Sequence, residues 1–139
     1  MNKLENLDSS PFLGFDFDGT ICQEIPWNRI GWIVQHVSWL WKIIAVHYLK
    51  PLYHPQGKFI IISARPEFDR EIVERWLNKH HIYPQDIVLA PRLFEDREER
   101  ARWKAQMIEE YNIKTYIEND TFVYNYLKEH CPSLNVILF

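Results

Sequence analysis

Cysteine is scarce in this sequence, which has only Cys22 and Cys131 among its 139 residues. Two cysteines so far apart provide neither the closely spaced pairs of a zinc site nor the several bridges of a small secreted domain. Residues 1–11 are polar and acidic, and they lack the apolar core of a secretory signal peptide. We therefore expect a cytoplasmic protein whose thiols are reduced.

An excess of positive charge is also absent, since 16 Lys and Arg residues face 19 Asp and Glu residues and the net charge is −3. Proteins that bind nucleic acid without sequence preference carry a strong basic field, so that class is disfavoured. An anionic substrate must instead be held by a local group of basic side chains. Repeats and low-complexity tracts are absent too, and the chain length fits a single domain spanning residues 1–139.

One hydrophobic run, residues 30–49, is long enough to cross a membrane, but Lys42 and two histidines within it are costly in hydrocarbon. Its apolar residues form two stripes at helical spacing. One stripe is Ile30, Val34, Val37, Trp41, Ile44 and Tyr48, and the other is Trp32, Trp39, Ile43 and Val46. Packing on the domain explains one stripe only. The second leaves four alternatives: a buried core helix, a cover over the active site, a homodimer contact through the 27–49 helix, or a helix on a membrane surface.

Short apolar runs alternate with amphipathic stretches along the rest of the chain. The apolar runs predict strands at Phe12–Asp18, Lys58–Ser63, Asp86–Ala90, Thr115–Glu118 and Asn135–Phe139. The amphipathic stretches predict helices at Glu67–His80, Asp96–Tyr111 and Thr121–Glu129. This order predicts an α/β fold with a doubly wound, mostly parallel, five-stranded sheet. Residues 21–56 then form a helical cap or insertion after the first strand.

Chemically reactive side chains follow the apolar runs. In sheets of this kind, ligands bind beyond the carboxyl ends of the strands. The polar residues at these ends are Asp16, Asp18 and Thr20 after the first run, Ser63 and Arg65 after the second, Arg92 after the third, and Glu118 and Asp120 after the fourth. We therefore expect one site at this edge of the sheet.

The segment 16–20 (Asp-Phe-Asp-Gly-Thr) places two carboxylates two residues apart. In extended backbone both face the same side, where they repel each other unless a cation lies between them. Mg²⁺ suits this arrangement because it prefers oxygen ligands. Gly19 permits a sharp turn that brings backbone N–H groups toward a phosphate. The alternative is an ordinary Asp-Gly turn in which Thr20 caps a helix.

This segment resembles the first motif of the haloacid-dehalogenase-like (HAD) phosphohydrolases. Residues 60–66 (Ile-Ile-Ile-Ser-Ala-Arg-Pro) resemble the second motif of that family, and Lys104, inside a helix before the fourth strand, resembles the cation of the third. Residues 116–120 (Tyr-Ile-Glu-Asn-Asp) resemble the acidic fourth motif. The resemblance covers nearly the whole of Phe12 to Phe139 and explains residues 21–57 least.

The resemblance implies a phosphate-monoester hydrolase. Asp16 would attack phosphorus and form an aspartyl-phosphate, and Asp18 would protonate the leaving oxygen and then activate water. Ser63 and Lys104 would bind the phosphoryl oxygens. Mg²⁺ would be held by Asp16, the backbone carbonyl of Asp18 and an acid of the fourth motif. The family usually has an Asp directly after the strand or two adjacent Asp, whereas here Glu118 and Asp120 flank Asn119, so both are candidate metal ligands.

Residues 89–92 (Leu-Ala-Pro-Arg), followed later by Trp103-Lys104, resemble the phosphatase domains of polynucleotide end-repair enzymes. A nucleotide or nucleic-acid end is therefore the first expected substrate, and a sugar phosphate or other phosphorylated small molecule is the alternative. The residues expected to bind substrate are Gly19, Thr20, Ala64, Arg65 and Arg92.

Four of the candidate site residues, Arg65, Arg92, Ser63 and Lys104, also have a purely structural interpretation. Arg65 and Arg92 would clamp a second phosphate, or they would form surface ion pairs with Glu67, Glu95 or Asp96. Ser63 would cap the following helix, and Lys104 would be a solvated surface residue. The alternative to an enzyme is a non-catalytic HAD-like binding protein that docks through its aromatic helix to a partner or a membrane. The irregular fourth motif favours this alternative, and the presence of both Asp16 and Asp18 argues against it.

Overall fold

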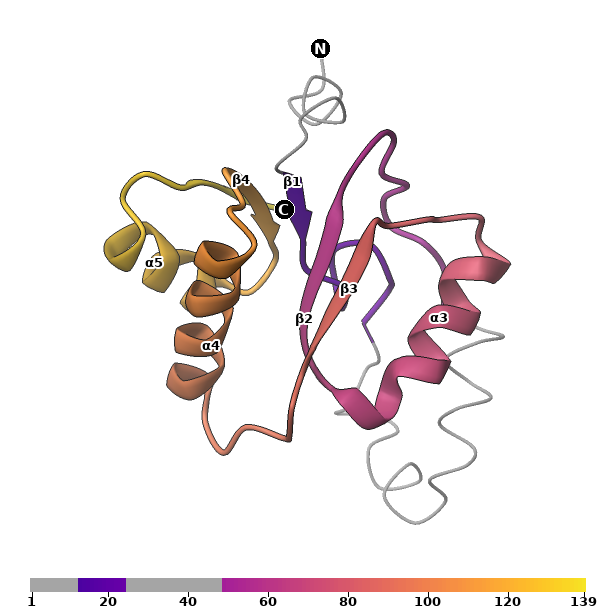
Figure 1. Cartoon of the computed structure of the whole chain (residues 1–139), viewed down its shortest axis with the longest axis horizontal. Coiled ribbons are helices and arrows are strands. Elements are labelled where there is room, and N and C mark those ends of the chain that lie inside the picture. The colour runs from indigo at the N-terminus through magenta and orange to yellow at the C-terminus, as the bar shows by residue number, and fades with distance from the viewer. Residues whose placement is uncertain (1–12, 25–48) are drawn as a thin grey trace.

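The computed structural model describes residues 13–24 and 49–139 of the chain. In this part, five strands form one parallel sheet in the order β3-β2-β1-β4-β5. The strands are β1 Leu13–Phe15, β2 Ile60–Pro66, β3 Asp86–Ala90, β4 Thr115–Glu118 and β5 Asn135–Leu138; the helices are the short 3₁₀ helix η1 Glu67–Asp69, then α3 Arg70–Lys79, α4 Arg97–Glu110 and α5 Thr121–His130. Helix α3 covers one face of the sheet, and α4 and α5 cover the other (Figure 1). The fold is a doubly wound α/β fold, as the sequence predicts.

Two hydrophobic cores attach the helices to the sheet. On the α3 side, Phe15 of β1 packs in one cluster with Val73 and Trp76. On the other side, Tyr116 of β4 packs in a cluster with Leu127 of α5. Because neighbouring residues of a strand face opposite sides, β2, β3, β4 and β5 supply side chains to both cores, whereas β1 has Gly14 on the second face and supplies only the α3 side. The strand ends, where the polar residues lie, are thereby held in a constant position.

The first two strands differ from the predicted bounds. Strand β1 ends at Phe15 rather than at Asp18, because the chain turns directly after Asp16: the N–H groups of Ile21 and Cys22 both donate to the Phe17 carbonyl, at 3.1 and 3.0 Å. Strand β2 continues past Ser63 to Pro66, through a shift in its pairing with β3. Asp16 therefore lies directly after β1, where its N–H still donates to the Ile117 carbonyl at 2.9 Å, and Asp18 lies in the turn that follows.

The predicted insertion 21–56 is described only at its two ends. There the N–H of Gln23 donates to the Lys50 carbonyl at 2.9 Å, and the N–H of Leu52 donates to the Ile21 carbonyl at 2.8 Å, so the two ends run side by side. Residues 25–48 lie outside the described part, and they include nearly all of the predicted 27–49 helix. The four alternatives for that helix, namely a core helix, a cover over the site, a dimer contact and a membrane-surface helix, therefore stay predictions. No helix in the described residues is long and apolar enough to span a bilayer.

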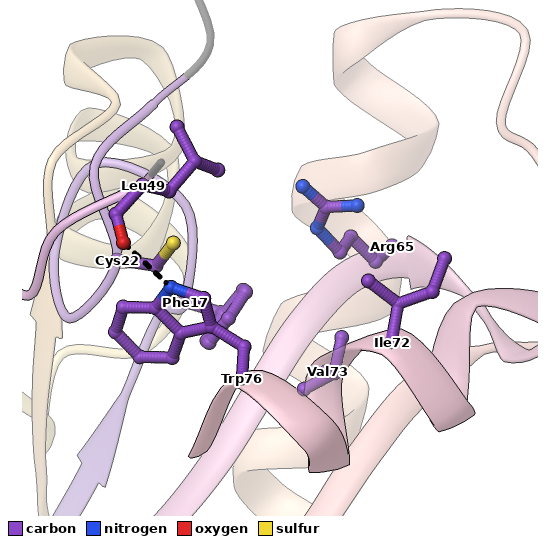
Figure 2. Close-up of a pocket in the computed structure, with 7 residues that line it drawn as sticks. All are labelled: Phe17, Cys22, Leu49, Arg65, Ile72, Val73 and Trp76. Carbon is purple, nitrogen blue, oxygen red and sulfur yellow. Dashed lines mark hydrogen bonds between the residues drawn. The ribbon is translucent and has the colours of Figure 1, made fainter. Parts of the chain in front are cut away.

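A small cavity lies where the insertion meets α3 (Figure 2). The indole N–H of Trp76 donates to the Leu49 carbonyl at 3.0 Å and attaches the end of the insertion to the helix. The side chains that line the cavity are mostly apolar, and Arg65 is the charged one among them. The cavity therefore borders the candidate site on its α3 side.

Candidate active site

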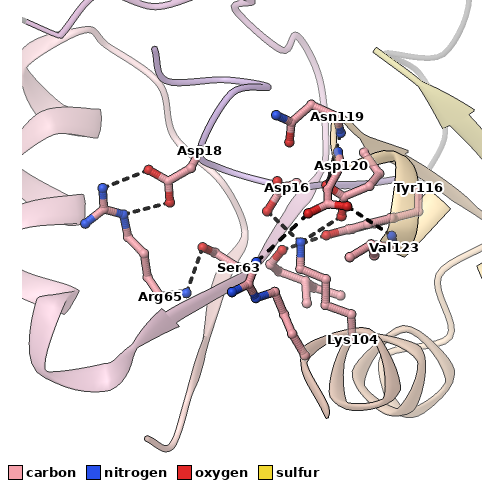
Figure 3. Close-up of polar contacts among 12 residues, drawn as sticks. Asp16, Asp18, Ser63, Arg65, Lys104, Tyr116, Asn119, Asp120 and Val123 are labelled. Carbon is pink, nitrogen blue, oxygen red and sulfur yellow. Dashed lines mark hydrogen bonds and ion pairs between the residues drawn. The ribbon is translucent and has the colours of Figure 1, made fainter. Parts of the chain in front are cut away.

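Lys104 joins two carboxylates from different strands. Its Nζ donates to Asp16 Oδ1 at 2.9 Å and to Glu118 Oε2 at 2.7 Å (Figure 3). The lysine residue is 3% exposed, Asp16 6% and Glu118 0%, so the whole group is buried. The interpretation of Lys104 as a solvated surface residue is wrong, because the side chain points from α4 toward the ends of β1 and β4.

The charges in this triad do not balance, since one ammonium faces two carboxylates. Burial raises the pKa of Asp16 well above its usual value; the charge of Glu118 raises it further, and Lys104 opposes the change. Burial lowers the pKa of Lys104, but the charges of Asp16 and Glu118 outweigh burial and raise it. The ammonium therefore stays charged. A buried group with an excess negative charge favours the binding of a proton or a cation.

The acids of the predicted fourth motif have separate positions. Glu118 Oε1 accepts the backbone N–H groups of Asn119 and Asp120, both at 3.0 Å, while its other oxygen contacts Lys104. Asp120 caps α5, because its Oδ1 accepts the N–H groups of Phe122 and Val123 at 2.8 and 3.2 Å. Glu118 thus belongs to the triad, whereas the Asp120 side chain is engaged at the start of the helix.

Asp18 contacts a different cation from Asp16. Arg65 Nε and Nη2 donate to Asp18 Oδ2 and Oδ1 at 2.8 and 2.7 Å, and Arg65 Nη1 donates to Asp69 Oδ2 at 3.2 Å. Burial lowers the pKa of Arg65, but its contacts with Asp18 and Asp69 outweigh this and raise it. The prediction that Asp16 and Asp18 face the same side is therefore wrong, because β1 ends at Phe15 and the carboxylates diverge (Figure 3).

Ser63 lies between these two ion-paired groups (Figure 3). It is 1% exposed, and its Oγ accepts the backbone N–H of Arg65 at 3.2 Å. The interpretation of Ser63 as a helix cap is wrong, because Pro66 occupies the cap position of η1 and Asp69 that of α3. Ala64, the next residue, is partly buried in β2.

Gly19 brings the first predicted motif against the fourth. Its φ is +76°, and a Cβ added there would lie 2.1 Å from Asn119 Nδ2. The neighbouring Thr20 is fully buried, and its Oγ1 has no hydrogen-bond partner. No helix in the described residues begins at Thr20, so this side chain is not a helix cap.

Gly19→Ala should lower the free energy of unfolding. The left-handed backbone alone costs an L-residue about 1–2 kcal/mol, and the Asn119 amide must also move. Urea unfolding of Gly19→Ala in the wild-type and Asn119→Ala backgrounds separates the two contributions, since Asn119→Ala removes the contact and leaves the φ unchanged. A Gly19→Ala variant as stable as wild type would contradict this account of the turn.

Arg92 is not part of either ion-paired group. Its side chain is 58% exposed and pairs with Glu99, which is none of the three acids expected from the sequence. Asp69 and Asn119 were not predicted from the sequence. The spacing of Asp69 four residues after Arg65 is a signal for an ion pair within one turn; no comparable signal singles out Asn119.

Within residues 13–24 and 49–139, no three His, Cys, Asp or Glu side chains are grouped in a way that could hold a metal ion. Lys104 lies between Asp16 and Glu118, Asp18 faces Arg65, and Asp120 caps α5. Mg²⁺ needs only one or two carboxylates, because it keeps several waters. The oxygen donors and the excess negative charge of the triad fit such an ion.

No family model matches the sequence, and no curated protein matches it either. Two solved structures are similar in fold: a chain of the Pnkp1/Rnl/Hen1 complex and a chain of the Pnkp1/Rnl/Hen1 RNA repair complex. In both cases the TM-score is 0.57, the identity is 16%, and 91% of this chain is covered. The match spans 44% and 41% of those longer chains, which is less than half of each. At this identity the similarity shows the α/β fold alone.

Proposed function

We propose that this protein is a magnesium-dependent, HAD-like phosphate-monoester hydrolase with Asp16 as its nucleophile. The observation that carries the proposal is the buried Asp16–Lys104–Glu118 triad at the carboxyl ends of β1 and β4. A triad with an excess negative charge is a poor device for stability alone. Its contacts do, however, hold the Asp16 carboxylate in a fixed position from which it can attack phosphorus.

In the proposed reaction, an Asp16 oxygen attacks phosphorus while the ester oxygen leaves with a proton from Asp18. Water then attacks the aspartyl-phosphate, Asp18 accepts a proton from it, and Asp16 and inorganic phosphate are released. Lys104 and Ser63 hold the phosphoryl oxygens on which negative charge gathers. Magnesium, held by Asp16, the Asp18 carbonyl and Glu118 or Asp120, would offset the repulsion between carboxylate and phosphate.

For the substrate we propose a nucleotide or a nucleic-acid end. Two considerations support this class: the sequence resemblance to polynucleotide end-repair phosphatases, and the fold similarity to chains of an RNA repair complex. Arg92, exposed beyond β3, has the side chain to contact a second phosphate. Arg65 is less suited to that role, because its side chain is 11% exposed and already binds Asp18 and Asp69.

A non-catalytic binding protein is the second candidate. It is favoured by the contacts of the fourth motif, where Glu118 already receives Lys104 and two backbone N–H groups and Asp120 caps α5. A binding protein would not need a proton donor at Asp18, so catalysis itself distinguishes the two candidates.

Phosphate release should therefore be measured with and without Mg²⁺ from p-nitrophenyl phosphate, a nucleoside monophosphate, a sugar phosphate and a phosphorylated oligonucleotide. We expect Mg²⁺-dependent release, fastest from the nucleotide or oligonucleotide. Asp18→Asn should slow turnover by about 10²–10⁴-fold, because it removes the proton donor. The control is Asp86→Asn, an exposed acid at the start of β3 and away from the site. No release from any substrate, or equal rates for both variants, would contradict the proposal.

A further inference from the structure

We propose that Asp69 is a positioning residue that acts on Asp18 through Arg65. Asp69 holds Arg65 and balances its charge when Asp18 turns from Arg65 toward the substrate. The inference rests on the proposed function, in which Asp18 exchanges a proton with the leaving group. Because Asp18 is bound to Arg65, it must move away from that residue before it can reach the leaving group.

Both oxygens of Asp18 are bound to Arg65, at 2.7 and 2.8 Å, while Asp16 is bound to Lys104. Figure 3 shows the two carboxylates pointing to their separate partners. When Asp16 attacks phosphorus, the leaving oxygen lies in line on the far side of the phosphorus atom. Both Asp18 oxygens are bound to Arg65, so Asp18 must give up at least one of these contacts to pass a proton to that oxygen. The Asp18 side chain is 29% exposed, compared with 8% for Asp16, and has more room to rotate.

The departure of Asp18 would be costly if Arg65 were left without charge compensation. The Arg65 side chain is 11% exposed, and its guanidinium lies 5.8 Å from the centre of the Phe17 ring. The cavity beside it (Figure 2) is otherwise lined by apolar groups and the Cys22 thiol, whose pKa burial raises to about 12. In such surroundings an uncompensated cation is strongly unfavourable.

Asp69 supplies that compensation. Its Oδ2 accepts from Arg65 Nη1 at 3.2 Å, on the opposite branch of the guanidinium from Asp18. Asp69 occupies the N-cap position of α3, where an Asp usually accepts helix N–H groups, yet its side chain makes no capping hydrogen bond. The carboxylate is directed at Arg65 instead.

One guanidinium shared by two carboxylates holds each of them less strongly than it would hold one alone. With Asp18 bound, Arg65 contacts the carboxylates of both Asp18 and Asp69; with Asp18 turned away, the Asp69 carboxylate still balances the charge of Arg65. Asp69 therefore makes the movement of Asp18 less costly. It also keeps Arg65 in place to receive Asp18 again after turnover.

The test compares two leaving groups. p-Nitrophenolate leaves with little help from an acid, whereas the alkoxide of a nucleoside monophosphate needs a proton. Asp69→Asn strengthens the hold of Arg65 on Asp18. The ratio kcat/KM covers only the steps up to departure of the leaving group, so kcat/KM for the nucleoside monophosphate should fall about 10-fold or more, while kcat/KM for p-nitrophenyl phosphate changes less than about 3-fold. Adding Arg65→Gln to Asp69→Asn should bring the ratio of the two kcat/KM values back toward that of Arg65→Gln alone.

Glu71→Gln is the matched control, since it removes an exposed acid two residues further along, in the first turn of α3, that pairs with Arg75. Equal losses on both substrates, or a ratio that Arg65→Gln does not restore, would overturn the positioning role and leave the phosphatase proposal intact. A wild-type protein inactive on both substrates would instead overturn the phosphatase proposal and this inference with it. Melting temperatures of all variants identify any loss due to unfolding.

Discussion

Asp16→Asn should abolish phosphate release and, at the same time, raise the stability of the metal-free protein. Loss of the nucleophile should reduce kcat by roughly 10⁴-fold or more. Asparagine carries no charge, so Lys104 and Glu118 remain as a neutral buried pair. The free energy of unfolding at neutral pH should then rise by roughly 0.5–2 kcal/mol, as expected where an active site trades stability for function.

The sign of this effect depends on pH. The pKa of Asp16 in the folded state is raised above its ordinary value of 3.8, so the folded protein binds more protons than the unfolded chain between these two values. The contribution of Asp16 to the free energy of unfolding is thus fully present below about pH 3.8, and it is lost as the pH rises through the raised pKa of the folded state. In thermal unfolding in EDTA from pH 4 to 8, the melting temperature of Asp16→Asn should rise relative to that of wild type as the pH increases.

Two controls test whether the effect of Asp16→Asn on stability comes from the charge of the triad: the addition of Mg²⁺, and the substitution of an acid outside the triad. Mg²⁺ should raise the melting temperature of wild type more than that of Asp16→Asn, because a ligand stabilises only the state that binds it. Asp86→Asn, which lies outside the triad, should match wild type in both respects. A less stable Asp16→Asn at neutral pH would mean that the excess negative charge of the triad is already compensated.

Lys104→Met should destabilise the protein more than Gly19→Ala does. It leaves the buried carboxylates of Asp16 and Glu118 facing each other without a cation, and breaking a buried ion pair in this way costs about 3–5 kcal/mol. Urea unfolding measures the loss. Stability should recover in part as the pH is lowered, because Asp16 takes up a proton readily.

A second substitution tests the cause of that loss. Glu118→Gln added to Lys104→Met removes one of the two facing charges and should restore part of the stability. Arg102→Met changes a cation of the same helix whose side chain is 65% exposed, and it should shift the free energy of unfolding by no more than about 0.5 kcal/mol. If Lys104→Met were as mild as Arg102→Met, the triad would not hold the ends of β1 and β4 together.

The strands and helices were largely predictable because their patterns are local. The apolar runs Asp86–Ala90 and Thr115–Glu118 match β3 and β4, and the helical period of Asp96–Tyr111 matches α4 to within a residue at each end. The end of β1 was not predictable in the same way. It depends on N–H groups that donate to the Phe17 carbonyl, and a run of apolar and acidic residues does not reveal such a turn.

The sequence by itself determined the doubly wound α/β class and the gathering of Asp16, Ser63 and Glu118 at one edge of the sheet, since periodicity and strand order depend on neighbouring residues. Only the tertiary structure decided which charges meet. Lys104 and Asp16 are 88 positions apart, and Arg65 and Asp18 are 47 apart. Their pairing depends on how α4 and β2 pack beside β1, because a buried charge takes the partner that the packed backbone brings within hydrogen-bond distance.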